Sequence, residues 1–160
     1  MASTWKEPIF DRTSYDVAFA LQQISTWKNS HSPVSTVYDL KGCLNLSDLN
    51  RIEEDIKYLG ERLIAYRYPI VVNCKEWVRS DLPTIVDMQR IASNIRLLFT
   101  GFATPSEYSP VPDVMLSYND INAIERNLYL LKQMIDAMQG SFIISGTYKS
   151  GATNRLPLRR

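Results

Sequence analysis

The chain has 160 residues, of which 45% are hydrophobic and 22% are charged, with 18 Lys and Arg against 17 Asp and Glu. This composition is that of one ordinary globular domain, so it argues against wholesale disorder and against a fibrous repeat. A formal net charge of +1 also lacks the strong field on which many nucleic-acid and membrane-surface proteins depend, so we expect no nucleic-acid partner and no membrane contact.

The first ten residues show no secretory signal, because Lys6, Glu7 and Pro8 interrupt any apolar run. No stretch of the chain approaches 18 uninterrupted apolar residues. We therefore expect synthesis in the cytoplasm.

Four helix starts of one kind follow along the chain, separated by 32, 39 and 33 residues. In each, a Ser, Thr or Asn is followed three residues later by Asp, which is a capping box with Asp in place of the commoner Glu. The first side chain accepts from an early helical N–H, while the carboxylate reaches back and complements the positive end of the helix dipole. The four pairs are Thr13 with Asp16, Asn45 with Asp48, Thr84 with Asp87, and Ser117 with Asp120.

The same apolar stripe follows each helix start. Counted from the aspartate, apolar residues stand at positions +1, +4, +8 and +11 in all four copies, which predicts amphipathic helices over 13–28, 46–66, 85–100 and 118–139. We expect these four helices to pack around one core. The second and fourth copies are the most alike and the first is the weakest; duplication and convergence on ordinary capped helices both explain the pattern. The stripe residues are Val17, Ala20, Ile24 and Trp27; Leu49, Ile52, Ile56 and Leu59; Met88, Ile91, Ile95 and Leu98; and Ile121, Ile124, Leu128 and Leu131.

Long loops rich in helix-breaking residues separate the predicted helices, at 29–42, 68–83 and 101–116, and we expect them to pack on the helices. A polar residue stands seven positions after the boxed aspartate in the last three copies, as Asp55, Asn94 and Asn127. These side chains share one edge of the apolar stripe. We expect them to form hydrogen bonds with the loops.

The pattern changes after Gly140. A run of β-type residues predicts a strand, and a basic tail without acidic residues follows it. We interpret 1–140 as a helical domain and 141–160 as an assembly element that pairs with a partner protein; pairing within the chain is the alternative. The predicted partner-binding residues are Phe142, Ile144, Tyr148, Arg155, Arg159 and Arg160.

Catalytic and metal-binding motifs are sparse. Cys43, Cys74 and His31 are the only Cys and His residues, fewer than the four ligands of a structural zinc site, so we expect no metal. A disulfide between the two cysteines is possible, but reduced thiols are favoured. No phosphate-binding glycine motif is present, and the acidic pair Glu53 and Glu54 fits an ordinary solvated helix face. We expect no cofactor and no enzymatic activity.

Three segments together resemble a known class of proteins. The run KGCLNLSDLNRIE at 41–53, the opening WKEPIFDRT at 5–13 and the helix segment DINAIE at 120–125 are similar to virion proteins of tailed bacteriophages of Gram-positive hosts and of related phage-like contractile particles. The resemblance implies a helical structural protein of the virion tail, in the baseplate or at a fibre attachment, that works by assembly.

From this resemblance we expect other virion proteins as partners, in an oligomeric ring or as adaptor contacts. Many such modules are joined to a longer fibre, and we expect no receptor-binding or carbohydrate-active region in this chain. The alternative interpretation is an independent cytosolic helical module that binds proteins.

Overall fold

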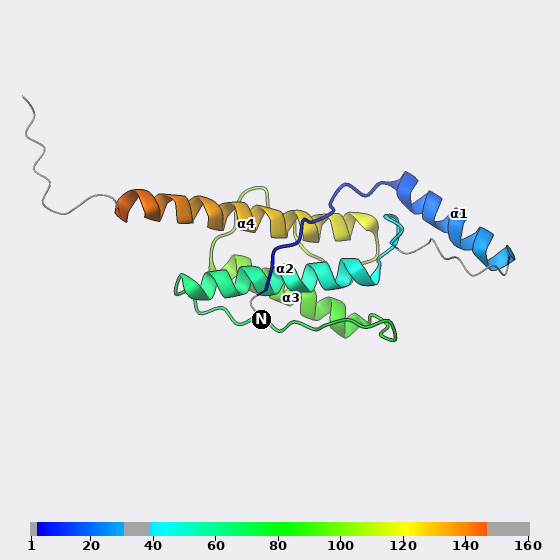
Figure 1. Ribbon diagram of the computed structural model, residues 1–160, viewed down its shortest axis with the longest axis horizontal. Coiled ribbons are helices and arrows are strands. Elements are labelled where there is room, and N and C mark those ends of the chain that lie inside the picture. The colour runs from blue at the N-terminus through cyan, green and yellow to red at the C-terminus, as the bar shows by residue number, and fades with distance from the viewer. Residues whose placement is uncertain (1–2, 31–38, 147–160) are drawn as a thin grey trace, which may run out of the picture.

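The computed structural model describes residues 3–30 and 39–146, and these form four α-helices without a β-strand. The helices are α1 (Ser14–Ser30), α2 (Leu46–Ala65), α3 (Ile85–Gly101) and α4 (Tyr118–Gly146) (Figure 1). The prediction of a mainly helical chain with four helices is confirmed, and each helix begins within one residue of its predicted start.

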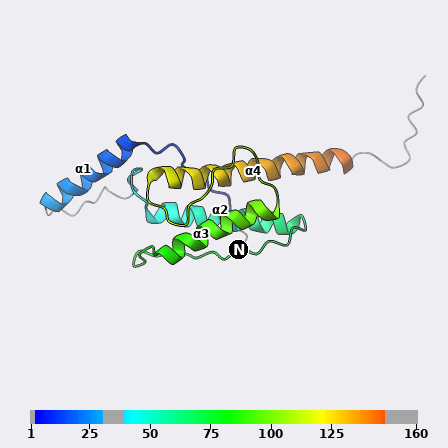
Figure 2. The ribbon, with the colours of Figure 1, turned by 180° about the vertical axis from the view of Figure 1, so that it is seen from behind.

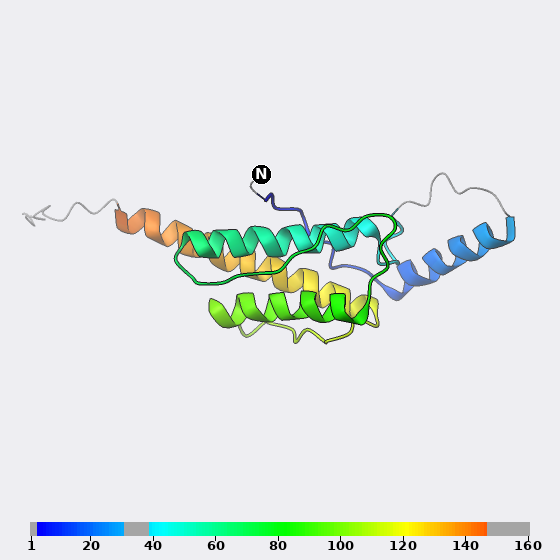
Figure 3. The same ribbon diagram turned by 90° about the horizontal axis from the view of Figure 1, so that it is seen from below.

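Helices α2, α3 and α4 lie side by side and enclose the hydrophobic core (Figure 3). The predicted stripes of these helices face this core, because nearly all their members are buried. Fully inaccessible members include Ile52, Ile56, Leu59, Ile95 and Leu128.

Helix α1 does not join the bundle but projects from one of its ends (Figure 1). Among the residues of α1 only Ala20 is buried, and none belongs to the described core. The expectation that all four helices share one core is therefore wrong for α1. Its stripe has the right spacing, but Trp27 at the end of the stripe remains 46% exposed.

The three bundled helices run in the same direction, which explains the long loops (Figures 1 and 3). Arg51 pairs with Glu125 and, 11 residues further along both helices, Arg62 pairs with Asp136, as parallel neighbours require. The connections from α2 to α3 and from α3 to α4 must therefore return the chain along the bundle. We call one segment of each connection a strap: the middle strap (69–78) and the last strap (105–113). Residues 3–12, which also lie against α2 and α4, form the N-terminal strap. Figure 2 shows from behind how the chain between α3 and α4 runs beside both helices.

All four helix starts carry the reciprocal bond of a capping box. The hydroxyl of Thr13 lowers the pKa of Asp16 by its hydrogen bond, and Thr84 acts in the same way on Asp87. The main-chain N–H of the cap residue donates to the aspartate at 2.7 Å for Thr13, 2.9 Å for Asn45, 3.1 Å for Thr84 and 2.9 Å for Ser117.

Helix α4 continues to Gly146, beyond Gly140, so its last turns cover the first residues of the predicted strand. The rest of that element, 147–160, lies outside the described residues. The strand and the basic tail stay predictions.

Helix α2 ends in a left-handed turn at Arg67, whose φ is 70°. The N–H of Tyr68 donates to the carbonyl of Leu63 at 3.0 Å, and the N–H of Arg67 donates to Ile64 at 2.9 Å, which are the two bonds of a Schellman motif. Glycine is usual at the left-handed position, because a Cβ is strained there. This turn directs the chain into the middle strap.

Replacing Arg67 by glycine should therefore stabilise the protein. We expect Arg67→Gly to raise the free energy of unfolding by up to about 1 kcal/mol, since relief of left-handed strain outweighs the greater freedom of glycine in the unfolded chain. Urea denaturation measures the change. Arg67→Ala keeps the Cβ and should bring no gain, so equal stabilisation by both variants would contradict this explanation.

Candidate functional site

Buried side-chain amides hold the straps by bonding both main-chain polar groups of one strap residue. Asn94 of α3 accepts from the N–H of Asn73 at 3.1 Å and donates to its carbonyl at 2.7 Å. Asn127 of α4 holds Ser109 in the same way, at 3.1 and 2.7 Å. These bonds satisfy main-chain groups that packing removes from water. The expectation that position +7 forms hydrogen bonds with the loops is confirmed.

A second pair of amides stands two residues after the boxed aspartate. Asn50 of α2 accepts from the N–H of Trp77 at 2.8 Å and donates to its carbonyl at 3.0 Å. Asn122 of α4 holds Arg12 likewise, at 3.2 and 2.8 Å. The middle strap is thereby fixed to α2 and the N-terminal strap to α4.

We call these side-chain contacts clamps; they recur around the bundle, at position +7 in all three bundled helices and at position +2 in α2 and α4. Position +7 of α3 and position +2 of α2 hold the middle strap. Position +7 of α2, which is Asp55, accepts from the N–H of Lys6 at 2.8 Å, so α2 and α4 hold the N-terminal strap in the same way. Position +7 of α4 holds the last strap against α3, where Arg96 donates to the carbonyl of Val111 at 2.6 Å. The sequence repeat is therefore a repeat of contacts.

A buried ion-pair network joins the N-terminal strap to α2 and α4. Arg12 Nη2 lies 2.8 Å from Asp48 Oδ1 and 3.2 Å from Glu125 Oε1, while Arg51 Nη2 lies 2.5 and 2.7 Å from the same two oxygens. Glu125 also accepts from the main-chain N–H of Ile9. The Arg12 residue is only 4% exposed. Two cations balance two carboxylates away from water, so removing one member leaves a buried charge unpaired.

The interface of α2 with α3 uses the same register positions. Glu53, at +5 like Glu125, accepts from Arg90 Nη2 at 2.5 Å and from the indole N–H of Trp77 at 3.2 Å. Both interfaces pair an arginine at +3 with a glutamate at +5 of the neighbouring helix. Between α3 and α4 these positions are Ala92 and Ala123, so the third interface relies on other contacts.

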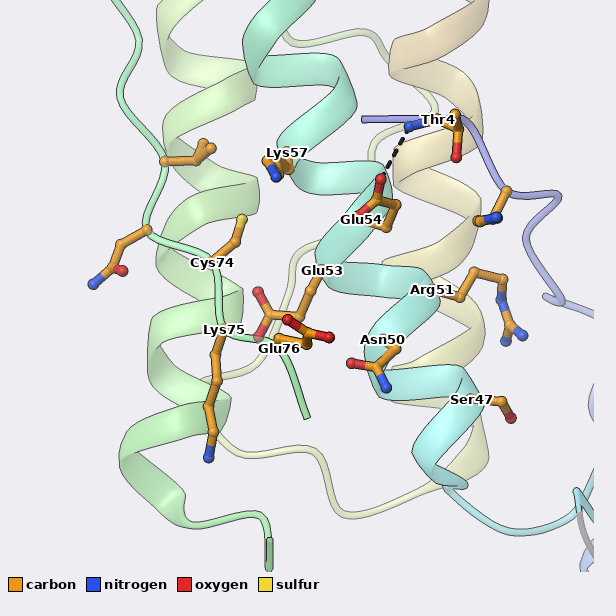
Figure 4. A pocket seen from close by; sticks show the side chains of 13 residues that line it. Thr4, Ser47, Asn50, Arg51, Glu53, Glu54, Lys57, Cys74, Lys75 and Glu76 are labelled. Atoms are coloured by element: carbon orange, nitrogen blue, oxygen red, sulfur yellow. Dashed lines mark hydrogen bonds between the residues drawn. The ribbon is translucent and has the colours of Figure 1, made fainter. Parts of the chain in front are cut away.

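A groove of about 960 Å³ lies along α2 between the N-terminal and middle straps (Figure 4). Its walls carry both signs of charge, including Lys57 and Glu54 of α2 and Glu76 of the middle strap. Burial, with a contribution from the carboxylate of Glu53, raises the pKa of the Cys74 thiol in this groove to about 12. The thiolate is therefore scarce at neutral pH, and Cys74 is not an activated nucleophile.

Helix α1 interrupts the order in which a strap precedes each bundled helix. In the sequence, the middle and last straps precede α3 and α4, whereas α1 and residues 31–45 stand between the N-terminal strap and α2. Gly42 packs closely against the first turn of α1. A Cβ at this position would lie 2.0 Å from the carbonyl oxygen of Asp16, so a larger residue does not fit. Lys41 adds an ion pair with Asp11 at 2.9 Å.

Exposed apolar side chains gather on α1 and at the end of the bundle from which it projects. On α1 they include Tyr15, Phe19, Leu21 and Trp27, of which Leu21 is 62% exposed. Because the bundled helices are parallel, their first turns all lie at this end. We call the exposed apolar residues in or just before these first turns the apolar end; they are Leu46, Leu82, Ile85, Val86 and Leu116. Exposed apolar surface of this kind is typical of protein contacts.

The structure leaves the predicted partner-binding residues largely outside its description. Phe142 and Ile144 belong to the last turns of α4, where side chains are not described, and the remaining four, Tyr148, Arg155, Arg159 and Arg160, lie outside the described residues. His31 lies outside them too. Cys43 and Cys74 carry free thiols. Within residues 3–30 and 39–146, no group of three or more His, Cys, Asp or Glu residues is arranged to hold a metal ion.

Comparison with protein-family models, with curated proteins and with solved structures finds no match to this chain. In the described part of the chain, no helix combines the length and the apolar character needed to cross a membrane.

The two boxed aspartates Asp48 and Asp120 should differ sharply in their contribution to stability. Asp120→Ala removes a cap alone and should lower the free energy of unfolding by about 0.5–2 kcal/mol. Asp48→Ala also leaves Arg12 and Arg51 short of a buried partner and should lower it by about 3–5 kcal/mol. Chemical denaturation of both variants measures the difference. Equal losses would show that the buried network contributes nothing beyond the cap.

Proposed function

We propose that the chain is a structural subunit of a phage-like tail particle, a tail, baseplate or fibre-attachment adaptor that works through protein–protein assembly. The sequence resemblance of residues 5–13, 41–53 and 120–125 supports the proposal. The structural observation that carries it is the gathering of exposed apolar side chains on α1 and at the apolar end. The resembling run 41–53 covers the turn at the base of α1 and the first turns of α2.

Helix α1 exposes apolar side chains that support a contact with a partner protein. Apolar side chains point to several sides of it, with Val17 and Ile24 half-buried and Phe19 and Leu21 exposed. Its only charged residues, Asp16 and Lys28, stand near its two ends. A partner surface that covers Phe19 and Leu21 therefore meets a stretch of the helix without charged residues.

The rest of the molecule suits an adaptor. Its core, straps and buried ion pairs are complete without α1, so the bundle presents a fixed base from which α1 reaches a neighbour. Residues 141–160 form a second proposed contact, in which Arg155, Arg159 and Arg160 would meet an acidic surface of a neighbouring subunit.

Polar substitutions on α1 test the main contact. In the cells that make the protein, a tagged chain carrying Phe19→Ser and Leu21→Ser should be lost from purified large particles at least tenfold relative to the unaltered chain, because both side chains are exposed in the single chain. Mass spectrometry of the particles measures incorporation. Circular dichroism should show an unchanged helical fold.

A matched control is Val71→Ser, which alters an 81%-exposed apolar residue on the middle strap, away from α1 and the apolar end. This variant should enter the particle normally. If the α1 variant also incorporates normally, α1 is not an assembly contact. If the unaltered chain is recovered as a small species without particle proteins, the independent protein-binding module is the better interpretation.

Removal of residues 147–160 tests the second contact. The truncation leaves α4 intact as far as Gly146. We expect unchanged thermal unfolding and reduced incorporation, with the deficit shrinking as salt is raised because ionic contacts are screened. Normal incorporation at low salt would exclude the tail from assembly.

A further inference from the structure

The clamp of the N-terminal strap contains an acid where the other two clamps at position +7 contain an amide. Asp55 of α2 occupies the register position of Asn94 in α3 and Asn127 in α4. All three side chains are buried, with Asp55 only 1% exposed. The three clamps therefore occupy equivalent buried positions, but one uses a carboxyl group and two use amides.

The hydrogen bonds of Asp55 show what the difference does. Its Oδ1 accepts from the N–H of Lys6 at 2.8 Å, as the amide oxygens of the other clamps accept from their strap residues. In Asn94 and Asn127 the second atom, Nδ2, donates to the carbonyl of the same strap residue at 2.7 Å. The second atom of Asp55, Oδ2, is buried and has no hydrogen-bond partner among the described residues. A carboxylate has no hydrogen to donate, whereas a protonated carboxyl has one.

We propose that Asp55 is held as a neutral carboxylic acid that imitates the asparagine clamps, and that loss of its proton selectively loosens the N-terminal strap. The Oδ2–H of the acid supplies the donor that the amide Nδ2 supplies in the other two clamps. In the carboxylate, Oδ2 has no hydrogen to donate, and the clamp keeps only the bond from the N–H of Lys6.

The surroundings of Asp55 favour this neutral form and raise its pKa to about 7. Burial is the largest cause, and the carboxylates of Glu125 on α4 and Glu54 on α2 act in the same direction. The N–H of Lys6 from the strap and the guanidinium of Arg51 on α2 act in the opposite direction. The proton is therefore bound at mildly acidic pH and released around neutrality.

The direction of the pH effect follows from this raised pKa. An open strap lets Asp55 return to the ordinary value of 3.8, so only the closed strap holds the proton between pH 4 and 7. The equilibrium for opening should rise by up to tenfold per pH unit across this range and level off above about pH 7. Strap closure is thus strongest in acid and weaker at neutral and alkaline pH.

Amide hydrogen exchange of Lys6 in the full chain tests the proposal, with Asp55→Asn as the reference at every pH. Comparison at equal pH removes the intrinsic pH dependence of exchange. We expect the ratio of opening between the unaltered chain and Asp55→Asn to rise at least tenfold from pH 4.5 to pH 7 and then to flatten. The carboxyl carbon of Asp55 should titrate near pH 7 in an NMR experiment. A flat ratio, or titration near pH 4, would overturn the proposal.

A transplanted acid provides the matched control. Asn127→Asp places the same acid in the clamp of the last strap, so the amide of Ser109 should acquire the pH dependence seen at Lys6. If this variant folds and Ser109 exchanges independently of pH relative to the unaltered chain, the equivalence of the clamps is wrong and the proposal fails with it. If it does not fold, the titration of Asp55 decides alone.

Discussion

The pairing of main-chain polar groups in the straps is the constraint on which this bundle depends. Parallel helices require long return segments, and these segments lie over the grooves without a sheet or helix to satisfy their N–H and carbonyl groups. Each buried polar group left unpaired costs about 1–3 kcal/mol. Side chains such as Asn50 and Asn94 supply the missing partners, so the straps close the grooves and complete the core.

Helix geometry explains why the strap contacts and the interhelical ion pairs use positions +2, +3, +5 and +7. At about 100° per residue, the stripe at +1, +4, +8 and +11 covers one face, +2 and +5 lie on one flank of it, and +3 and +7 lie on the other. In a bundle of three parallel helices each flank meets a different neighbour. A helix with this register therefore serves two grooves at once, as α2 does through Asn50 and Glu53 on one side and Arg51 and Asp55 on the other.

Local patterns predicted the helices, their caps and the strap contacts of Asn94 and Asn127, because those features depend on spacing within one segment. They did not predict the place of α1, since an apolar stripe does not state which surface covers it. The sequence difference lies on the flanks of the stripe, at positions +2, +5 and +7. There α1 has Ala18, Leu21 and Gln23, whereas α2 and α4 have strap-binding and ion-pairing residues at all three positions. The parallel direction and the buried Arg12 network were also missed, because both arise from segments distant in sequence.

The N-terminal strap connects the buried ion-pair network to helix α1, which projects from the bundle. It ends at Arg12, in the buried network, and the next residue, Thr13, caps α1. The orientation of α1 therefore depends on how firmly this strap is seated. This strap is also the one held by an acid, Asp55, at position +7 in place of an amide. If α1 reaches a neighbouring subunit, a proton-dependent clamp at Asp55 acts on the segment that positions that contact. The middle and last straps are held at the same register position by the amides of Asn94 and Asn127, which do not titrate.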